Sequence, residues 1–226
     1  MRGLMGERPR TRRAGGRVER GFSLVEILVV ITLIGLLMTF GYSAIRGAME
    51  NGRVVKCQNN LDQIGQALLS YKNIRNKGRW PQDGGARFLL TLHRHREVQG
   101  RDAEIFLCPG TDDRNDLGPS GAPGSSYEDW EQITSDSISY AGRDVSAYPV
   151  RGPDPGDEVL AADDHEFAPN HSVTTNILYG NGAVVAFDLF IDGADILAEY
   201  PEYEELGALP VGPESPYEPF QVLRID

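Results

Sequence analysis

Residues that could do chemistry gather at three places in this 226-residue sequence. The first is Glu26, a carboxylate that stands directly before 19 consecutive uncharged residues, Ile27 to Ile45. The second is a pair of thiols, Cys57 and Cys108. The third is a cluster of oxygen and nitrogen donors, formed by Asp163, Asp164, His165, Glu166, Asn170 and His171. These groups suit ion pairing, thiol oxidation and cation binding respectively.

The donor cluster could hold a cation, because carboxylate oxygens are the ligands that Ca²⁺ prefers. Asp163 and Asp164 are the calcium candidates, although the spacing of the cluster matches no standard calcium loop. A solvated acidic turn is the alternative interpretation. No other cofactor is predicted.

The sequence lacks the patterns that are typical of enzymes and nucleic-acid binders. It contains no Gly-x-Ser-x-Gly elbow, no phosphate-binding glycine loop and no His-Glu-x-x-His pair. Its net charge of -11 argues against nucleic acid as a partner, because phosphate binding needs a basic face. The sequence therefore predicts neither an enzyme nor a nucleic-acid-binding protein.

The apolar run is long enough to cross a membrane as a helix. At 1.5 Å per residue its 19 residues reach about 28 Å, close to the thickness of the hydrocarbon core. Seven arginines against two glutamates in residues 1–21 predict a cytoplasmic N-terminus and a body on the other side of the membrane. A buried core helix and a cleaved secretory signal peptide are the alternatives. A signal peptide has a shorter apolar region and ends in a small-residue cleavage site, which this segment lacks.

Helical periodicity continues beyond the apolar run and predicts an amphipathic helix that packs on a globular body. Its apolar stripe comprises Val54, Cys57, Leu61, Ile64, Leu68 and Tyr71. Val173–Tyr179 and Ala183–Leu189 are predicted to pair as a hairpin through Gly180-Asn181-Gly182. Further short strands are expected at 137–140, 145–150 and 158–162. The predicted fold is α+β, a long helix with a transmembrane half and an amphipathic half, packed on a small antiparallel sheet.

These patterns divide the chain into five segments. They are a basic leader (1–21), a transmembrane helix (22–45), an amphipathic helix (46–80), a loop-rich β domain (81–198) and an acidic, proline-rich tail (199–226). The tail is expected to be extended and partly disordered, with a last strand near Phe220.

The segment Gly21-Phe22-Ser23-Leu24-Val25-Glu26, between the basic leader and the apolar run, resembles the type IV prepilin-like family, which includes the pseudopilins of type II secretion. The resemblance implies that a prepilin peptidase cuts after Gly21 and that the new N-terminus, Phe22, is methylated. It also implies that Glu26 is the assembly residue. A carboxylate in lipid needs a partner, and the amino-terminus of a neighbouring subunit is a suitable one.

A second stretch, from Cys57 to Leu68, resembles a branch of pseudopilin-like proteins that also carries a Cys-Pro, here Cys108-Pro109. That branch ends in a His-x9-Asp-Gly signature, which here reads His171, nine residues, then Asn181-Gly182. We interpret the signature as a fold determinant in which Asn181 takes a positive φ. In an oxidising compartment Cys57 and Cys108 would form a disulfide, and two buried free thiols are the alternative.

The resemblance implies a structural subunit of a type II secretion-like pseudopilus that serves protein secretion. Its partners would be the prepilin peptidase, like subunits and other pseudopilins, the inner-membrane assembly platform and membrane lipid. It would reside in the bacterial inner membrane as a single-pass protein with a periplasmic body and then join the pseudopilus. Major pseudopilins bind calcium, which adds to the calcium expectation. The alternative is a membrane-anchored extracytoplasmic binding module that never polymerises and could hold Ca²⁺ on its acidic face.

Overall fold

The computed structural model describes residues 21–152, 155–163 and 170–225. The chain divides into two compact units, Met1–Ile45 and Arg46–Asp226. The long helix α1, Leu24–Ser70, contributes residues to both of them. Of the helices that the structure describes, none alone satisfies the length and hydropathy required of a membrane span. The segments Leu24–Thr39 and Ala44–Arg75 satisfy those requirements only as a pair, by length and composition.

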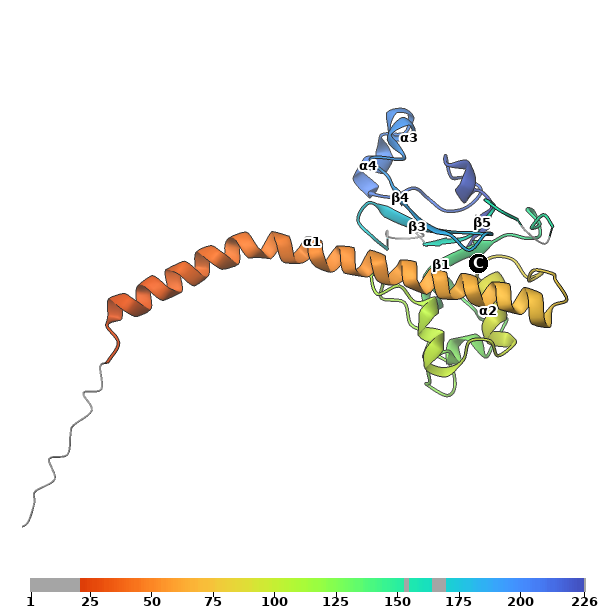
Figure 1. The fold of residues 1–226 in the computed structure, drawn as a ribbon, viewed down its shortest axis with the longest axis horizontal. Helices are drawn as coiled ribbons and strands as arrows, with labels where there is room; N and C mark the ends of the chain where they lie inside the picture. The colour runs from red at the N-terminus through yellow and green to blue at the C-terminus, as the bar shows by residue number, and fades with distance from the viewer. Residues whose placement is uncertain (1–20, 153–154, 164–169, 226) are drawn as a thin grey trace, which may run out of the picture. The chain divides into compact units, whose positions relative to one another are not determined.

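The second unit contains an antiparallel β-sheet (Figure 1). The sheet has five strands in the order β4-β3-β2-β1-β5. The strands are β1 Tyr140–Arg143, β2 Val159–Asp163, β3 Thr174–Tyr179, β4 Val184–Asp188 and β5 Leu223–Arg224. A π-helical turn, Tyr71–Arg75, ends α1, and the helices that follow are α2 Ala86–Arg94, α3 Ala194–Glu199 and α4 Glu202–Leu206. The predicted α+β class is confirmed.

Both faces of the sheet are covered, which gives this unit two apolar cores. Tyr140, Leu160 and Leu178 belong to the core that includes the buried residues of α1 and α2. On the other face, Ala141 and Ile177 belong to a core completed by Phe187, Leu189, Leu209, Phe220 and Leu223. Successive side chains of β1 and β3 thus pack into the two cores on opposite faces of the sheet, as the two-residue period of a strand requires.

The second half of α1 packs on the sheet through the predicted stripe. Cys57, Leu61, Ile64 and Leu68 are fully buried. Gly65 lies on the same face, and a Cβ atom at this position would stand 2.8 Å from Leu178 Cδ1 of β3. Glycine is therefore what allows the helix to approach the sheet this closely. The predicted amphipathic helix is confirmed, but it ends at Arg75 after its π-helical last turn and does not extend to residue 80.

The hairpin and the strand expected at 158–162 are also confirmed, but other expectations need correction. The strand expected at 137–140 begins only at Tyr140, because Ser135–Ser137 form a helical turn in which the Ser137 amide donates to the Thr134 carbonyl at 3.1 Å. Residues 145–150 form a turn, because the Asp144 carboxylate accepts hydrogen bonds from the amides of Ser146 and Ala147. The helix α2 was not predicted. The extended, partly disordered tail expected for residues 199–226 is wrong, because this segment contains α4 and its Leu209 and Phe220 side chains are buried. Its few apolar side chains outweigh its Glu- and Pro-rich composition, because each buried one contributes about 1.5–3 kcal/mol. The last strand expected near Phe220 is present as β5.

Candidate processing and assembly site

Glu26 closes a capping box at the start of α1. The Ser23 amide donates a hydrogen bond to Glu26 Oε2 at 2.8 Å, and the Val25 amide donates to Ser23 Oγ at 3.3 Å. Two of the amides left unsatisfied at a helix N-terminus thereby gain acceptors. The negative charge also lies where the helix dipole favours it. In the single chain, Glu26 is thus already held at the beginning of its own helix.

Sequence reasoning identified Glu26 and overlooked Ser23. The signal was present, because Ser at one position and Glu three residues later, directly before an apolar run, is the sequence pattern of a capping box. Ser23 therefore fixes both where α1 begins and how the Glu26 side chain is oriented.

Gly21 and Phe22 lie just outside the helix, in exposed non-helical backbone. The Phe22 side chain is 83% exposed, and a Cβ atom added at Gly21 would meet no other atom within 4 Å. A peptide bond in such a segment can enter a protease active site, whereas a helical one would first have to unwind. Cleavage between these residues would place a new amino group one residue before Ser23.

The first half of α1 carries an apolar surface that this chain leaves open. The large apolar side chains described between Leu24 and Met38 are all between 46% and 81% exposed. Because they include nearly every consecutive position, they point in all directions around the helix. A helix that is apolar on every side requires lipid or other helices around it.

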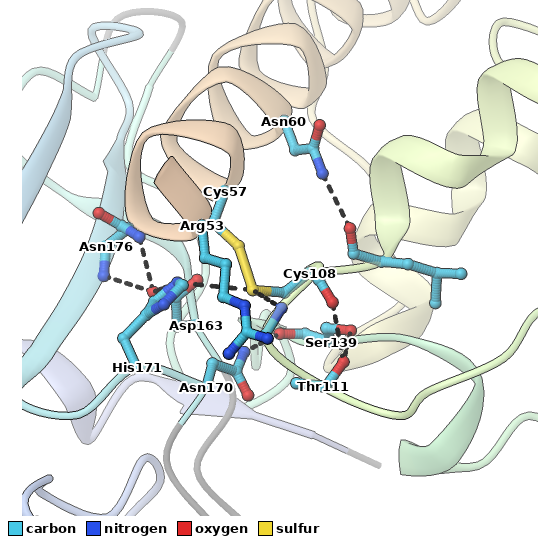
Figure 2. The surroundings of a disulfide bond; sticks show 12 residues. Arg53, Cys57, Asn60, Cys108, Thr111, Ser139, Asp163, Asn170, His171 and Asn176 are labelled. Carbon is cyan, nitrogen blue, oxygen red and sulfur yellow. Dashed lines mark hydrogen bonds and ion pairs between the residues drawn. A yellow bond between two sulfur atoms is a disulfide. The ribbon is translucent and has the colours of Figure 1, made fainter. Parts of the chain in front are cut away.

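In the second unit, Cys57 on α1 and Cys108 are joined by a disulfide that closes a sequence separation of 51 residues (Figure 2). His171 Nε2 lies 3.4 Å from Cys108 Sγ and 3.7 Å from Asp163 Oδ2. His171 Nδ1 lies 3.5 Å from Glu50 Oε1 on α1. Burial lowers the pKa of His171, and the nearby Glu50 carboxylate opposes that shift in part. A neutral imidazole therefore sits beside the disulfide at neutral pH.

The first calcium candidate, Asp163, is held inside the protein. Asp163, at the end of β2, is fully buried, and its Oδ2 accepts hydrogen bonds from the amide and side-chain nitrogens of Asn176, both at 2.8 Å. Asp164 lies outside the described residues. The Asp163 carboxylate thus faces the protein interior, and calcium binding at this pair stays a prediction.

The two ends of the His-x9-Asn-Gly signature lie in different parts of the fold. His171 belongs to the disulfide surroundings, whereas Asn181 and Gly182 form the β3–β4 turn. The expectation of a positive φ at Asn181 is wrong, because Gly182 takes it, with φ +86°. Asn181 instead accepts a hydrogen bond from the Ala183 amide at 2.9 Å through its side-chain oxygen. This arrangement is that of a three-residue hairpin loop with glycine in the left-handed position.

Comparison with protein families matches residues 16–42 to the prokaryotic N-terminal methylation motif. Comparisons with curated proteins and with solved structures give no match. The matched segment contains Gly21, Phe22, Ser23 and Glu26 and most of the apolar run. The chain therefore carries a type IV prepilin-like methylation motif, which implies processing by a prepilin peptidase, an N-terminal membrane anchor and assembly with like subunits as a structural protein.

Proposed function

We propose that this chain is a structural subunit of a type II secretion-like pseudopilus. A prepilin peptidase would cleave it after Gly21, and Phe22 would become a methylated N-terminus. The mature chain would wait in the inner membrane with its body in the periplasm. Subunits would then leave the lipid and stack through their apolar helices, which is how the protein would serve secretion.

The observation that carries this proposal is the open apolar surface of residues 24–38. Lipid would cover this surface before assembly, and neighbouring helices would cover it afterwards. Since lipid and packed helices are similarly apolar, the transfer itself changes little in free energy. The interaction that distinguishes the two states is therefore a polar one, and Glu26 is the charged side chain available for it.

Glu26 would direct the register of the stack. A charge within a membrane helix costs about 2.5–3.5 kcal/mol on insertion scales, and the capping box with Ser23 offsets part of that cost. In the filament the methylated amino group of a neighbouring Phe22 would pair with the Glu26 carboxylate. The secretion assignment itself is supported by the likeness of the stretch from Cys57 to Leu68 to pseudopilin-like proteins.

The test is filament incorporation of Glu26 variants expressed together with the wild-type assembly machinery. Glu26→Ala and Glu26→Gln should leave the chain in the membrane fraction and remove it from sheared or overproduced filaments. Glu204→Gln, an exposed acid on α4, is the matched control and should incorporate normally. Normal incorporation of both Glu26 variants would contradict the proposal that Glu26 sets the register of the stacked subunits.

Crosslinking separates the filament from a membrane-anchored module that never polymerises. Single cysteines placed along residues 27–38 should crosslink copies of the chain in a periodic pattern after assembly. If no position gives a crosslink in cells that make the assembly machinery, the membrane-anchored module is favoured. Calorimetry with Ca²⁺ on the full chain in detergent then asks whether calcium is a ligand.

A further inference from the structure

Three donor atoms converge beside β2 and α1, in the surroundings of the disulfide. Cys57 Sγ, Cys108 Sγ and one ring nitrogen of His171 all lie within 4.8 Å of one another. All three side chains are buried, with at most 2% of each residue exposed. Figure 2 shows them coming from three separate segments, α1, the stretch after residue 106 and the stretch before β3. This convergence is a property of the fold, because the residues are far apart in sequence.

A fourth donor stands on the same side of the imidazole. Asp163 Oδ2 lies 3.7 Å from His171 Nε2, and Nε2 is also the atom that lies 3.4 Å from Cys108 Sγ. Two hydrogen bonds from Asn176 hold this carboxylate in place. Two sulfurs, one imidazole nitrogen and one carboxylate oxygen form a donor set that tetrahedral zinc accepts.

The remaining contacts of His171 have the arrangement of an outer shell around a metal ligand. Its other ring nitrogen, Nδ1, lies 3.5 Å from Glu50 Oε1, and that oxygen also accepts a hydrogen bond from the Ser172 amide at 3.0 Å. A carboxylate beside Nδ1 favours the tautomer with its proton there, which leaves the lone pair on Nε2 directed at the sulfurs. Carboxylate–histidine pairs of this kind orient the ligand in metal sites.

We propose that, when its thiols are reduced, this chain binds one zinc-class cation through Cys57, Cys108, His171 and Asp163. The disulfide and the cation exclude each other, because tetrahedral zinc with bonds of about 2.3 Å keeps its two sulfurs roughly 3.8 Å apart. The observed 3.4 Å between Cys108 Sγ and His171 Nε2 is already close to the separation that such a site needs. The same four residues thus hold α1 on the sheet in two ways, one covalent and one metal-dependent.

Conversion between the two states balances with a phosphine as the reductant. The disulfide takes two electrons from the phosphine, which gains the oxygen of one water molecule, and the two protons of that water complete the two thiols. Binding of Zn²⁺ or Co²⁺ then displaces both thiol protons. In the reverse direction, a small-molecule disulfide takes two electrons from the Cys57 and Cys108 thiolates and two protons from solvent, and becomes two thiols. The two protein sulfurs thereby join as the disulfide, and the cation is released.

Cobalt titration of the full chain in detergent micelles tests the site. After reduction with a phosphine, which spares the cation from chelation by dithiols, Co²⁺ should bind at one ion per chain. Bound cobalt should show thiolate charge-transfer absorption and the visible bands of a tetrahedral ion, and Zn²⁺ should abolish both. The oxidised chain should show neither. A reduced chain that binds no Co²⁺, or binds it without the thiolate band, would overturn the proposal.

Variants then test the two ligands that are not sulfur. His171→Gln and Asp163→Asn should each weaken cobalt binding by at least about tenfold, and Glu50→Gln by about tenfold through the orientation of His171. His93→Gln is the matched control, because His93 lies on α2 and is in contact with Tyr127 instead. Cooperative thermal unfolding of each oxidised variant verifies that its body is folded. Unchanged binding in folded His171→Gln and Asp163→Asn would show that the two thiols bind metal without them and would refute the four-ligand site.

Discussion

The two halves of α1 are built from similar apolar residues but are stabilised by different surroundings. In residues 24–38 the large apolar side chains are exposed, and no face of the helix is buried in preference to another. In residues 57–68 a single stripe is buried, and a disulfide, a glycine and a buried amide fix it to the body. The apolar side chains of the first half require lipid or other copies of the chain to cover them, whereas those of the second half are covered by the chain itself. Matched substitutions in the two halves should therefore have different consequences.

The largest expected effect is removal of the disulfide, which belongs to the second half alone. In metal-free buffer, Cys57→Ser together with Cys108→Ser should lower the free energy of unfolding of the body by about 4 kcal/mol, since the bond closes a separation of 51 residues. Trp80 and Trp130 both lie in the body, so their fluorescence during urea unfolding reports this change. Membrane association through residues 22–45 should be unaffected. An unchanged unfolding midpoint would show that the bond constrains little.

A matched pair of leucines tests the comparison directly. Leu61→Ala should cost the body about 2–5 kcal/mol, because Leu61 is fully buried. Leu33→Ala, at a side chain that is 54% exposed, should leave the unfolding of the body unchanged within about 0.5 kcal/mol. The same urea titration measures both. Equal losses for the two variants would contradict the division of α1 into halves with different stabilising partners.

A matched pair of glycines has a smaller effect. Gly65→Ala places a methyl group against Leu178 and should destabilise the body by about 1 kcal/mol, after the gain in helix propensity is counted. Gly35 has open space around it, so Gly35→Ala should not change the unfolding of the body. If neighbouring helices approach closely at Gly35 in the filament, this variant should reduce filament incorporation instead. A Gly65→Ala body as stable as the wild type would mean that Leu178 repacks freely.

The smallest effect is a pH dependence that belongs to the body. Burial lowers the pKa of His93, and Glu128 opposes this in part, so the folded state binds its proton less readily than the unfolded chain does. The stabilising contribution is complete above the ordinary pKa of about 6.5 and is lost as the pH falls below it, by less than about 1.4 kcal/mol per pH unit. Urea unfolding at pH 7.5 and 5.5 should show a smaller difference in His93→Gln than in the wild type. An identical difference in both proteins would exclude His93 as its source.

Sequence and structure agree where the determining interactions are local. The hairpin around Gly182 and the stripe that includes Leu61 depend on turn chemistry and helical periodicity, and both were predictable. Ser23 was predictable in the same way, from the capping-box spacing to Glu26. The surroundings of His171 were not, because the sheet brings together residues from distant segments, and no pattern of spacing encodes that meeting.

The proposed role of the first half of α1 depends most on removal of the leader. Mass spectrometry of the native protein, purified from membranes and digested, measures the N-terminal peptide directly. We expect this peptide to begin at Phe22 and to carry one methyl group on its amino nitrogen, with residues 1–21 missing. A native chain that begins at any other residue, or that retains the leader, would contradict processing after Gly21 and the assembly mechanism that depends on it.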